Sequence, residues 1–282
     1  MNIRTSPRAI IKASIFALGG VLLIFLSTQS ASNDRNWNED QRILATATIS
    51  DDFVDIKNIR NFSYTSVDKF TPTYYDKKFD LRTLSSLDYI VEPFDNFGAA
   101  HTLLSFGFSD GSYISVSVEI RKEVGESFSP FKGVLRQYEL MYVIADERDV
   151  IKLRTNYRKD DVFVYPVTAS NEAIRAIFVS MLTRANKLST QPEFYNTLLS
   201  NCIINITNHV NALAPETVPW DYRLLFPANS DVYAQKLGLI AHGLTIEQAR
   251  AQYRVNEKAE RYAEDPEFSK RIREEFSQKN SN

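Results

Sequence analysis

The chain contains one cysteine, Cys202, and three histidines, His101, His209 and His242. Cys202 lies in LLSNCIINITNHV, at the first turn of a helix predicted over residues 200–213. Free backbone N–H groups and the helix dipole favour a thiolate there, and the same N–H groups can hold an oxyanion when the thiolate attacks a carbonyl. The position therefore suits a nucleophile. The alternative is a small buried hydrophobic residue.

A thiolate nucleophile needs an imidazole partner, and the sequence favours His101. His209 lies two helical turns beyond Cys202, about 10 Å along the axis, which is too far for a hydrogen bond. We expect it at the helix surface or the edge of the core. His242 lies near a helix end, where an interhelix turn explains it equally well. His101 opens a predicted strand, a rigid element that suits a catalytic base.

The predicted hairpin that carries His101 also suggests a third catalytic group. Two alternating runs flank Ser-Asp-Gly at residues 109–111, which is a strong hairpin signal. A three-residue loop with glycine in the left-handed position places Glu119 opposite His101, with Ser117 on the same face. Either could then fix the imidazole tautomer. A two-residue loop would send Glu119 to the other face, and the alternative role for Glu119 is a solvent-facing carboxylate or a salt bridge to a neighbouring base.

The elements around these residues predict an α+β fold. Short connections between the strand signals predict a largely antiparallel sheet. Ser170 is a candidate N-cap for a helix whose apolar residues recur at i, i+3, i+4 and i+7, so that one face packs on the sheet. The strand signals lie at residues 87–94, 101–108, 112–120, 137–146, 150–156 and 161–167.

The N-terminus predicts export. Arg4, Arg8 and Lys12 precede an uncharged, largely apolar run over residues 13–33. Positive residues before such a run keep the N-terminus in the cytoplasm and send the rest across the membrane. Because the cleavage signal is poor, the sequence favours an uncleaved anchor over a removed signal peptide. An exported protein usually pairs its cysteines or lacks them, so a single thiol needs a reason to exist.

Three regions follow from this organisation. Residues 1–33 form the membrane anchor or signal segment, residues 34–243 the catalytic domain, and residues 244–282 a charged helical extension. The extension is predicted to form two helices, the second capped by Asp265, with its charges facing solvent.

Composition and motifs exclude several classes of protein. The net charge is −2 and 24% of residues are charged, so no basic face is expected for nucleic acid. Three scattered histidines and one cysteine give no zinc spacing, and there is no Gly-rich phosphate loop and no G-x-S-x-G. We therefore expect no metal and no cofactor.

Several longer motifs resemble a known family. HTLLSFGFSDG, SVEIRKEVGE, RQYELMYVIADERDVIKLRTNYR, FYNTLLSNCIINITNHVN and PWDYRLLFP are similar to the exported domain of the Lnb-type bacterial lipoprotein N-acyltransferases, over roughly residues 35–241. The resemblance implies a cysteine–histidine enzyme that moves an acyl chain from a phospholipid to the α-amine of a diacylglyceryl lipoprotein. The family's cysteine falls on Cys202 and its histidine on His101, without a cofactor.

A looser resemblance concerns the fold. In the circularly permuted branch of the papain-like NlpC superfamily, a histidine strand precedes an Asn-Cys helix, as His101 precedes Asn201 and Cys202 here. This resemblance implies a papain-like, permuted arrangement. The stretch between histidine and cysteine is long here and contains its own strands and a helix, so the third catalytic residue does not carry over.

The candidate binding residues are Asn201, Tyr195 and Arg121. Arg121 or its neighbour Lys122 would meet a lipid phosphate, or else form an ordinary surface charge pair. Aromatic residues near both motifs would line an apolar groove towards the anchored end, or else belong to the core: Phe94, Phe97, Phe106, Phe108, Phe194 and Tyr195. Two rival interpretations remain, a papain-like cell-wall peptidase or amidase and a non-catalytic envelope scaffold with a buried thiol.

Overall fold

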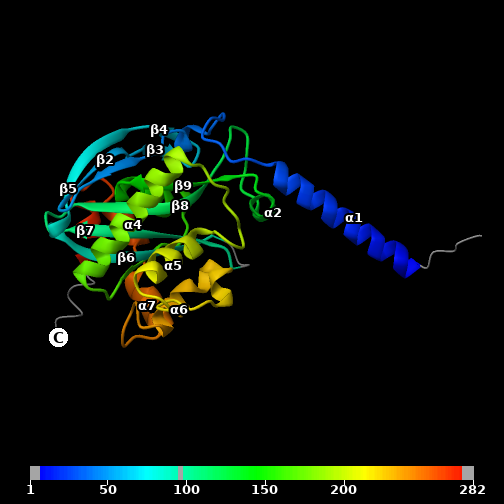
Figure 1. Cartoon of the computed structure of the whole chain (residues 1–282). Helices are drawn as coiled ribbons and strands as arrows, with labels where there is room; N and C mark the ends of the chain where they lie inside the picture. The colour runs from blue at the N-terminus through cyan, green and yellow to red at the C-terminus, as the bar shows by residue number, and fades with distance from the viewer. Residues whose placement is uncertain (1–6, 95–97, 275–282) are drawn as a thin grey trace, which may run out of the picture.

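The computed structural model describes residues 7–94 and 98–274, so the predictions for Arg4 and Phe97 lie outside the described residues. An eight-stranded sheet has the order β1-β2-β9-β8-β7-β6-β10, with β5 paired to β2 (Figure 1). Within the described residues β2 pairs with β9 in parallel and the other pairs are antiparallel. The predicted α+β class with a mostly antiparallel sheet is confirmed. The strands are β1 Thr46–Ile49, β2 Phe53–Arg60, β5 Tyr74–Asp80, β6 Leu84–Pro93, β7 Ala100–Phe108, β8 Tyr113–Arg121, β9 Glu139–Ala145 and β10 Phe163–Pro166, and β3 Ser63–Ser66 pairs with β4 Lys69–Thr71 separately.

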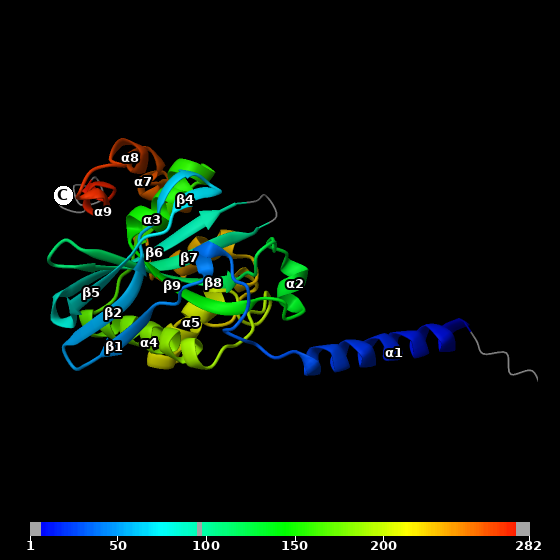
Figure 2. The same ribbon diagram turned by 90° about the horizontal axis from the view of Figure 1, so that it is seen from above.

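Helices cover both faces of the sheet. The two helices α4 and α5 pack on one face, while α3, α8 and α9 lie on the other (Figure 2). The short helix α2 lies beside the end of the sheet from which the N-terminal segment leaves (Figure 2). The helices are α1 Pro7–Thr28, α2 Pro130–Val134, α3 Glu147–Lys152, α4 Asn171–Thr190, α5 Cys202–Leu213, α6 Ser230–Lys236, α7 Ile246–Tyr253, α8 Asn256–Arg261 and α9 Phe268–Arg271.

The β7–β8 hairpin has the predicted three-residue loop. The Phe108 N–H donates to the Ser112 carbonyl over 2.9 Å, and Gly111 has a φ of 84°. This left-handed glycine sets the register, in which Leu103 pairs with Ser117. The His101 Nε2 atom lies 3.7 Å from the Glu119 carboxylate, so Glu119 is on the same face as His101, as the sequence predicted.

The helices on the site side begin where the sequence indicated. Ser170 accepts a hydrogen bond from the Ala173 N–H and caps α4, whose predicted apolar face is buried. Asn201 accepts from the Ile204 N–H and caps α5, so Cys202 is the first residue of that helix. The two caps therefore fix the start of each helix.

The predicted strand over residues 150–156 is wrong. The chain there forms α3, followed by a π-helical turn over Leu153–Arg158. Asp146 caps α3 by accepting from the Arg148 N–H. The buried positions are 150, 151, 153, 154 and 155, of which 150, 151, 154 and 155 have helical spacing, but two of these are Arg154 and Thr155. Because these buried residues are polar, the apolar pattern alone suggested alternation.

The C-terminal extension also differs from its prediction. In its described part, residues 244–274, three short helices replace the predicted two, and Asp265 accepts from the Glu267 N–H in a turn before α9 rather than capping the helix at Pro266. Nor do all its charges face solvent. The Arg273 guanidinium donates to Asp88 over 2.9 Å and to Glu147 over 2.5 Å, and both carboxylates are buried. The extension is therefore docked on the sheet.

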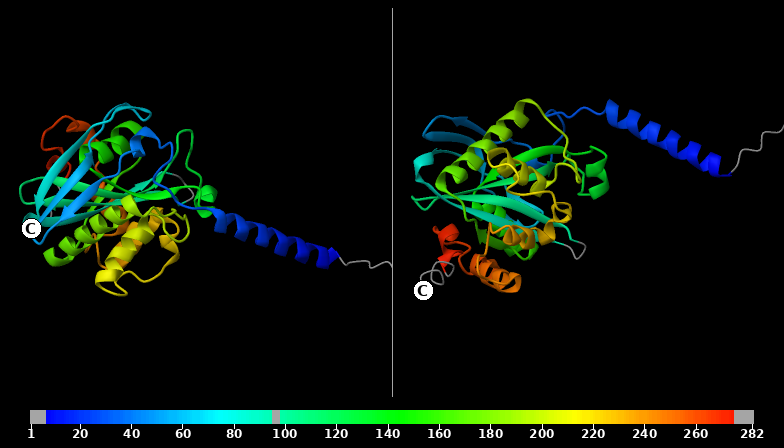
Figure 3. Two further views of the ribbon diagram at one scale, coloured as in Figure 1. Left: turned by 45° about the horizontal axis from the view of Figure 1, so that its top comes forward. Right: turned by 60° about the horizontal axis from the view of Figure 1, so that its bottom comes forward.

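The N-terminal helix α1 projects away from the rest of the molecule (Figure 3). Its stretch Ile11–Thr28 has a mean hydropathy of 2.0 and none of it is buried. By length and composition this helix can cross a membrane, and a signal sequence meets the same two criteria. It agrees with the predicted apolar N-terminal segment.

Candidate functional site

Cys202 lies at the start of α5, where the helix meets the beginning of β7. Its thiol is free and 6% of the residue is exposed. The sulfur lies 4.0 Å from the Ala100 carbonyl oxygen. The Asn201 side chain accepts from the Ile204 N–H, and the N–H groups that precede it in the first turn have no partner within the helix. A carbonyl oxygen placed there would meet backbone donors.

His101 is the histidine beside the thiol. Burial raises the pKa of the Cys202 thiol, but the hydrogen bond and the charge of His101 lower it, as do the hydroxyl and backbone of Thr102, so the net pKa lies below its ordinary value. A lowered pKa increases the fraction of the reactive thiolate. The thiol is thus buried and at the same time activated.

A serine connects His101 to a carboxylate. The His101 Nε2 atom lies 2.6 Å from the Ser117 hydroxyl, which donates to Glu119 over 2.8 Å. The direct distance from Nε2 to the Glu119 carboxylate is 3.7 Å. The sequence left Ser117 and Glu119 as alternatives for the third position, and the structure arranges them in series.

Glu119 is held in its charged form. Burial raises its pKa, but His101, Arg154, Arg60 and the Ser117 hydroxyl lower it by a larger amount, so the net pKa is far below the ordinary value. The Arg154 Nη2 atom lies 3.4 Å from the Glu119 carboxylate. Glu119 therefore pairs with Arg154 rather than with the neighbouring Arg121 or Lys122, and it presents a fixed negative charge to the serine and the imidazole.

The other two histidines contact hydroxyl groups, and neither is a partner of the thiol. His209 is buried, with Nε2 2.9 Å from the Tyr142 hydroxyl and Nδ1 2.7 Å from the Ser180 hydroxyl. His242 is exposed, and its Nε2 lies 3.0 Å from the Thr168 hydroxyl. The structure therefore brings His101 to Cys202, and holds His209 and His242 in hydroxyl contacts of their own.

The three candidate binding residues have different placements. The Asn201 amide also donates to the Leu224 carbonyl, so this residue positions the cysteine helix. Tyr195 is buried. It lies close enough to the thiol that the thiolate charge adds to burial in raising the pKa of Tyr195. Arg121 is 3% exposed and stacks over Trp37, with its guanidinium donating to Gln41, Asn33 and Arg42. It anchors residues 33–42, which we call the lead-in segment, between α1 and β1, and we do not retain it as a phosphate ligand.

Sequence reasoning missed two residues beside the thiol. Thr102 is fully buried, and its hydroxyl has no partner within hydrogen-bonding geometry among the described residues. It lowers the thiol pKa and can donate to a thiolate. Tyr89 also lies near the thiol. Burial raises the pKa of Tyr89, and the thiolate charge raises it as well. Thr102 directly follows His101, so adjacency was the available signal, whereas Tyr89 comes from the neighbouring strand β6.

Exposed apolar side chains gather around the same end of the sheet. We call this set the apolar rim: Phe94, Phe128, Phe131, Leu198, Leu199, Trp220, Tyr222 and Phe226. Phe131, Leu199 and Trp220 are 82%, 76% and 74% exposed, values that an ordinary core residue would not have.

Several contacts tie parts of the rim to their neighbours. The Phe94 and Phe128 rings meet edge to face, the Thr197 hydroxyl donates to the carbonyl of Pro130, the first residue of α2, and Phe226 lies against Gly98. Leu199 lines a small hollow together with Gln29 and Ala31, where the chain leaves α1. The rim therefore lies at the end of the body to which α1 is attached.

The aromatic groove predicted around both motifs is only partly present. Phe94 belongs to the rim. Phe106 and Phe108 are buried in the core against Phe178, so for them the alternative interpretation holds. No group of three His, Cys, Asp or Glu side chains within residues 7–94 and 98–274 is placed to hold a metal ion.

Comparison with known proteins supports one family. The sequence model described as the Lnb N-terminal periplasmic domain matches residues 70–228, which include Cys202, His101, Ser117 and Glu119. No curated protein and no solved structure matches the chain.

Proposed function

We propose that this chain, which belongs to the family of the Lnb N-terminal periplasmic domain, is a cysteine-dependent acyltransferase of the bacterial envelope. It would move an acyl chain from a phospholipid to the N-terminal amine of a diacylated lipoprotein. The observation that carries the proposal is the Cys202 thiol at a helix start, with its pKa lowered by His101.

In the first half-reaction the Cys202 thiolate attacks the carbonyl carbon of a phospholipid ester. The oxyanion that forms faces the first N–H groups of α5. The ester C–O bond then breaks, a C–S bond remains, and the lysophospholipid oxygen takes a proton from the His101 imidazolium. The product is a thioester on Cys202.

In the second half-reaction the lipoprotein amine attacks the thioester carbonyl. His101 accepts a proton from the amine, the C–S bond breaks, and an amide forms as the thiolate returns. The same imidazole thus gives a proton in one half-reaction and takes one in the other. The charged Glu119 stabilises its protonated form through Ser117.

The hydrogen bonds suggest which ring nitrogen faces the sulfur. Since the His101 Nε2 atom is occupied by Ser117, Nδ1 is the nitrogen left for the thiol. This order, thiol to Nδ1 and Nε2 to a polar orienting group, supports the papain-like, permuted arrangement that the sequence resemblance implied.

Substrate access distinguishes this proposal from a cell-wall peptidase or amidase. A peptidase needs a polar cleft for its peptide, whereas the surface around Cys202 carries the exposed aromatic and aliphatic residues of the rim. With α1 in the bilayer and the catalytic domain outside the cytoplasm, the rim would rest at the membrane surface, where both lipid substrates lie. Exposed Trp and Tyr side chains suit that interface.

The test uses the full chain and mass spectrometry. Incubation with phospholipid vesicles should leave an acyl adduct on Cys202 that hydroxylamine releases, and Cys202→Ser should form no such thioester. Cells that depend on the protein should contain N-acylated lipoproteins with the native chain and diacylated ones with the variant. Full acylation by the serine variant, or cleavage of peptidoglycan fragments without any adduct, would overturn the proposal.

A further inference from the structure

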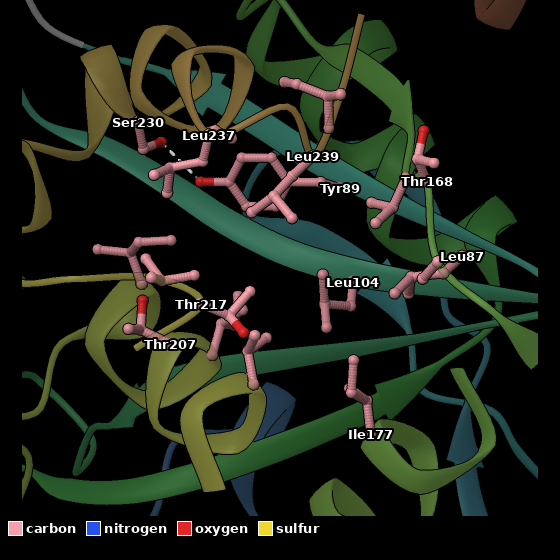
Figure 4. Close-up of a pocket in the computed structure, with 18 of the residues that line it drawn as sticks. Leu87, Tyr89, Leu104, Thr168, Ile177, Thr207, Thr217, Ser230, Leu237 and Leu239 are labelled. Carbon is pink, nitrogen blue, oxygen red and sulfur yellow. Dashed lines mark hydrogen bonds between the residues drawn. The ribbon is translucent and has the colours of Figure 1, made fainter. Parts of the chain in front are cut away.

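A second apolar feature lies inside the fold, next to the thiol. A cavity of about 300 Å³ lies between the sheet and the helices α4, α5 and α6 (Figure 4), and it is partly open to solvent at the end where Leu213 is exposed. None of the residues that line it is Asp, Glu, Lys, Arg or His. Leu87 and Leu104 form its floor on the sheet, and Leu237 and Leu239 face them from the other side.

The cavity follows the helix that begins with the nucleophile. Ile203, Ile206, Val210 and Leu213 line it from one face of α5, at i, i+3, i+7 and i+10. The first and last of these are ten residues apart, about 15 Å along the helix axis. Ile203 directly follows Cys202, so this row of lining residues begins in the first turn of the helix that carries the thiol.

Tyr89 marks the boundary between the cavity and the site. Its ring lines the cavity, and its phenol is close enough to the thiolate for that charge to raise its pKa. The Tyr89 hydroxyl donates to Ser230 over 2.6 Å, and Ser230 donates to the Pro227 carbonyl over 2.5 Å. These polar groups have partners, so the wall offers little to a peptide or a sugar.

We infer that this cavity holds the acyl chain while it is bound to Cys202. An apolar cavity without charged groups stays dry and takes an apolar guest. Its volume is at the lower end of ligand pockets, which fits one hydrocarbon chain and not a whole phospholipid. The long axis along α5 gives the chain a direction leading away from the sulfur. The inference rests on the proposed thioester and adds the site that holds its acyl chain. The buried Phe106 and Phe108 supply no groove for that chain.

The experiment measures chain length with a donor simpler than phospholipid. The full chain is mixed with p-nitrophenyl acetate, octanoate and palmitate, and the rate at which each acylates Cys202 is followed by mass spectrometry. We expect the rate to rise from acetate to palmitate. Val210→Phe fills the cavity halfway along α5, so it should slow palmitate at least about tenfold relative to acetate, since each excluded CH₂ loses its burial.

Two controls keep the result interpretable. Asn208→Phe puts the same ring on the exposed face of α5 and should leave all three rates near those of the native chain. Val210→Ala enlarges the cavity and should not reduce the preference for palmitate. If Val210→Phe also slows acetate by misfolding, the chain-length preference of Val210→Ala becomes the test of the cavity. Equal rates for the three esters in the native chain, or the same chain-length profile in all variants, would overturn the inference.

The outcomes also separate the cavity from the proposed function. If the esters acylate Cys202 with the expected chain-length dependence but phospholipid does not, the cavity stands and the phospholipid donor is wrong. If phospholipid acylates Cys202 and the Val210 variants do not alter chain preference, the donor stands and the cavity assignment is wrong.

Discussion

Two histidines of this protein each contact a serine, but the charged groups near the two rings have opposite signs. His101 and His209 each contact a serine hydroxyl, at 2.6 Å and 2.7 Å. Behind the first serine lies the charged Glu119, whereas the second imidazole has the Tyr142 hydroxyl on its other side and the Arg184 cation nearby.

The difference shows that hydrogen-bond partners alone do not make a catalytic histidine. Burial and, to a smaller extent, the Arg184 charge lower the pKa of His209 to about 4, so this imidazole is neutral at physiological pH. His101 instead lies beside the Cys202 thiol and contacts a serine hydroxyl that donates to the charged Glu119. Under the proposed function, this carboxylate is the feature that would allow His101, and not His209, to exchange protons with a substrate.

The largest effect should come from exchanging the two imidazoles for amides. His101→Gln should slow acylation of Cys202 by about a thousandfold, since the thiol loses its base and the leaving group its acid. His209→Gln, the matched control, should keep activity within a few-fold because that residue has no thiol and no carboxylate. Rates of thioester formation measure both. Comparable losses in the two variants would remove the distinction.

The sequence predicted the part of this site that local signals determine. The Ser-Asp-Gly loop specifies its own turn, and the turn specifies the register that places Glu119 and Ser117 on the face of His101. Helix caps at Ser170 and Asn201 are equally local. The cysteine and the histidine that the structure brings together could therefore be predicted as a pair before any tertiary contact was known.

Features that depend on tertiary contacts could not be predicted. Arg154 reaches Glu119 from a segment that the sequence suggested was a strand, because its buried positions are polar. Arg121 is next but one to Glu119, yet it is held by the lead-in segment through carbonyls at Gln41 and Arg42, which no motif indicates. Likewise nothing local shows that Arg273 pairs with Asp88 and Glu147 across the fold.

A second prediction concerns stability and acts on His209 alone. The unfolded chain binds a proton at this residue below a pH of about 6.5, and the folded chain only below about 4. Between these values the unfolded state holds more protons, so the folded state loses stability as the pH falls, by up to about 3 kcal/mol.

Urea unfolding of the native chain and of His209→Gln, at pH 7 and near pH 4.5, measures this contribution. The variant should lack that part of the pH dependence, because glutamine keeps hydrogen-bonding groups and takes up no proton. His242→Gln, at an exposed histidine, should behave like the native chain. The same pH dependence in His209→Gln and the native chain would show that His209 is not held neutral by the fold.

The smallest expected effect tests the serine that links His101 to Glu119. Ser117→Ala should raise the pKa of the Cys202 thiol by about one unit, because the imidazolium that stabilises the thiolate loses its connection to the carboxylate. Since Cys202 is the only cysteine in the chain, the pH dependence of its alkylation by iodoacetamide reports this pKa directly. Thioester formation near neutral pH should slow about tenfold, which corresponds to about 1.4 kcal/mol. Ser180→Ala removes the equivalent contact from His209 and should leave the alkylation profile unchanged. If both serine variants shift the profile equally, or neither does, Ser117 does not transmit the charge of Glu119, and the direct 3.7 Å approach of the carboxylate to the ring would have to suffice.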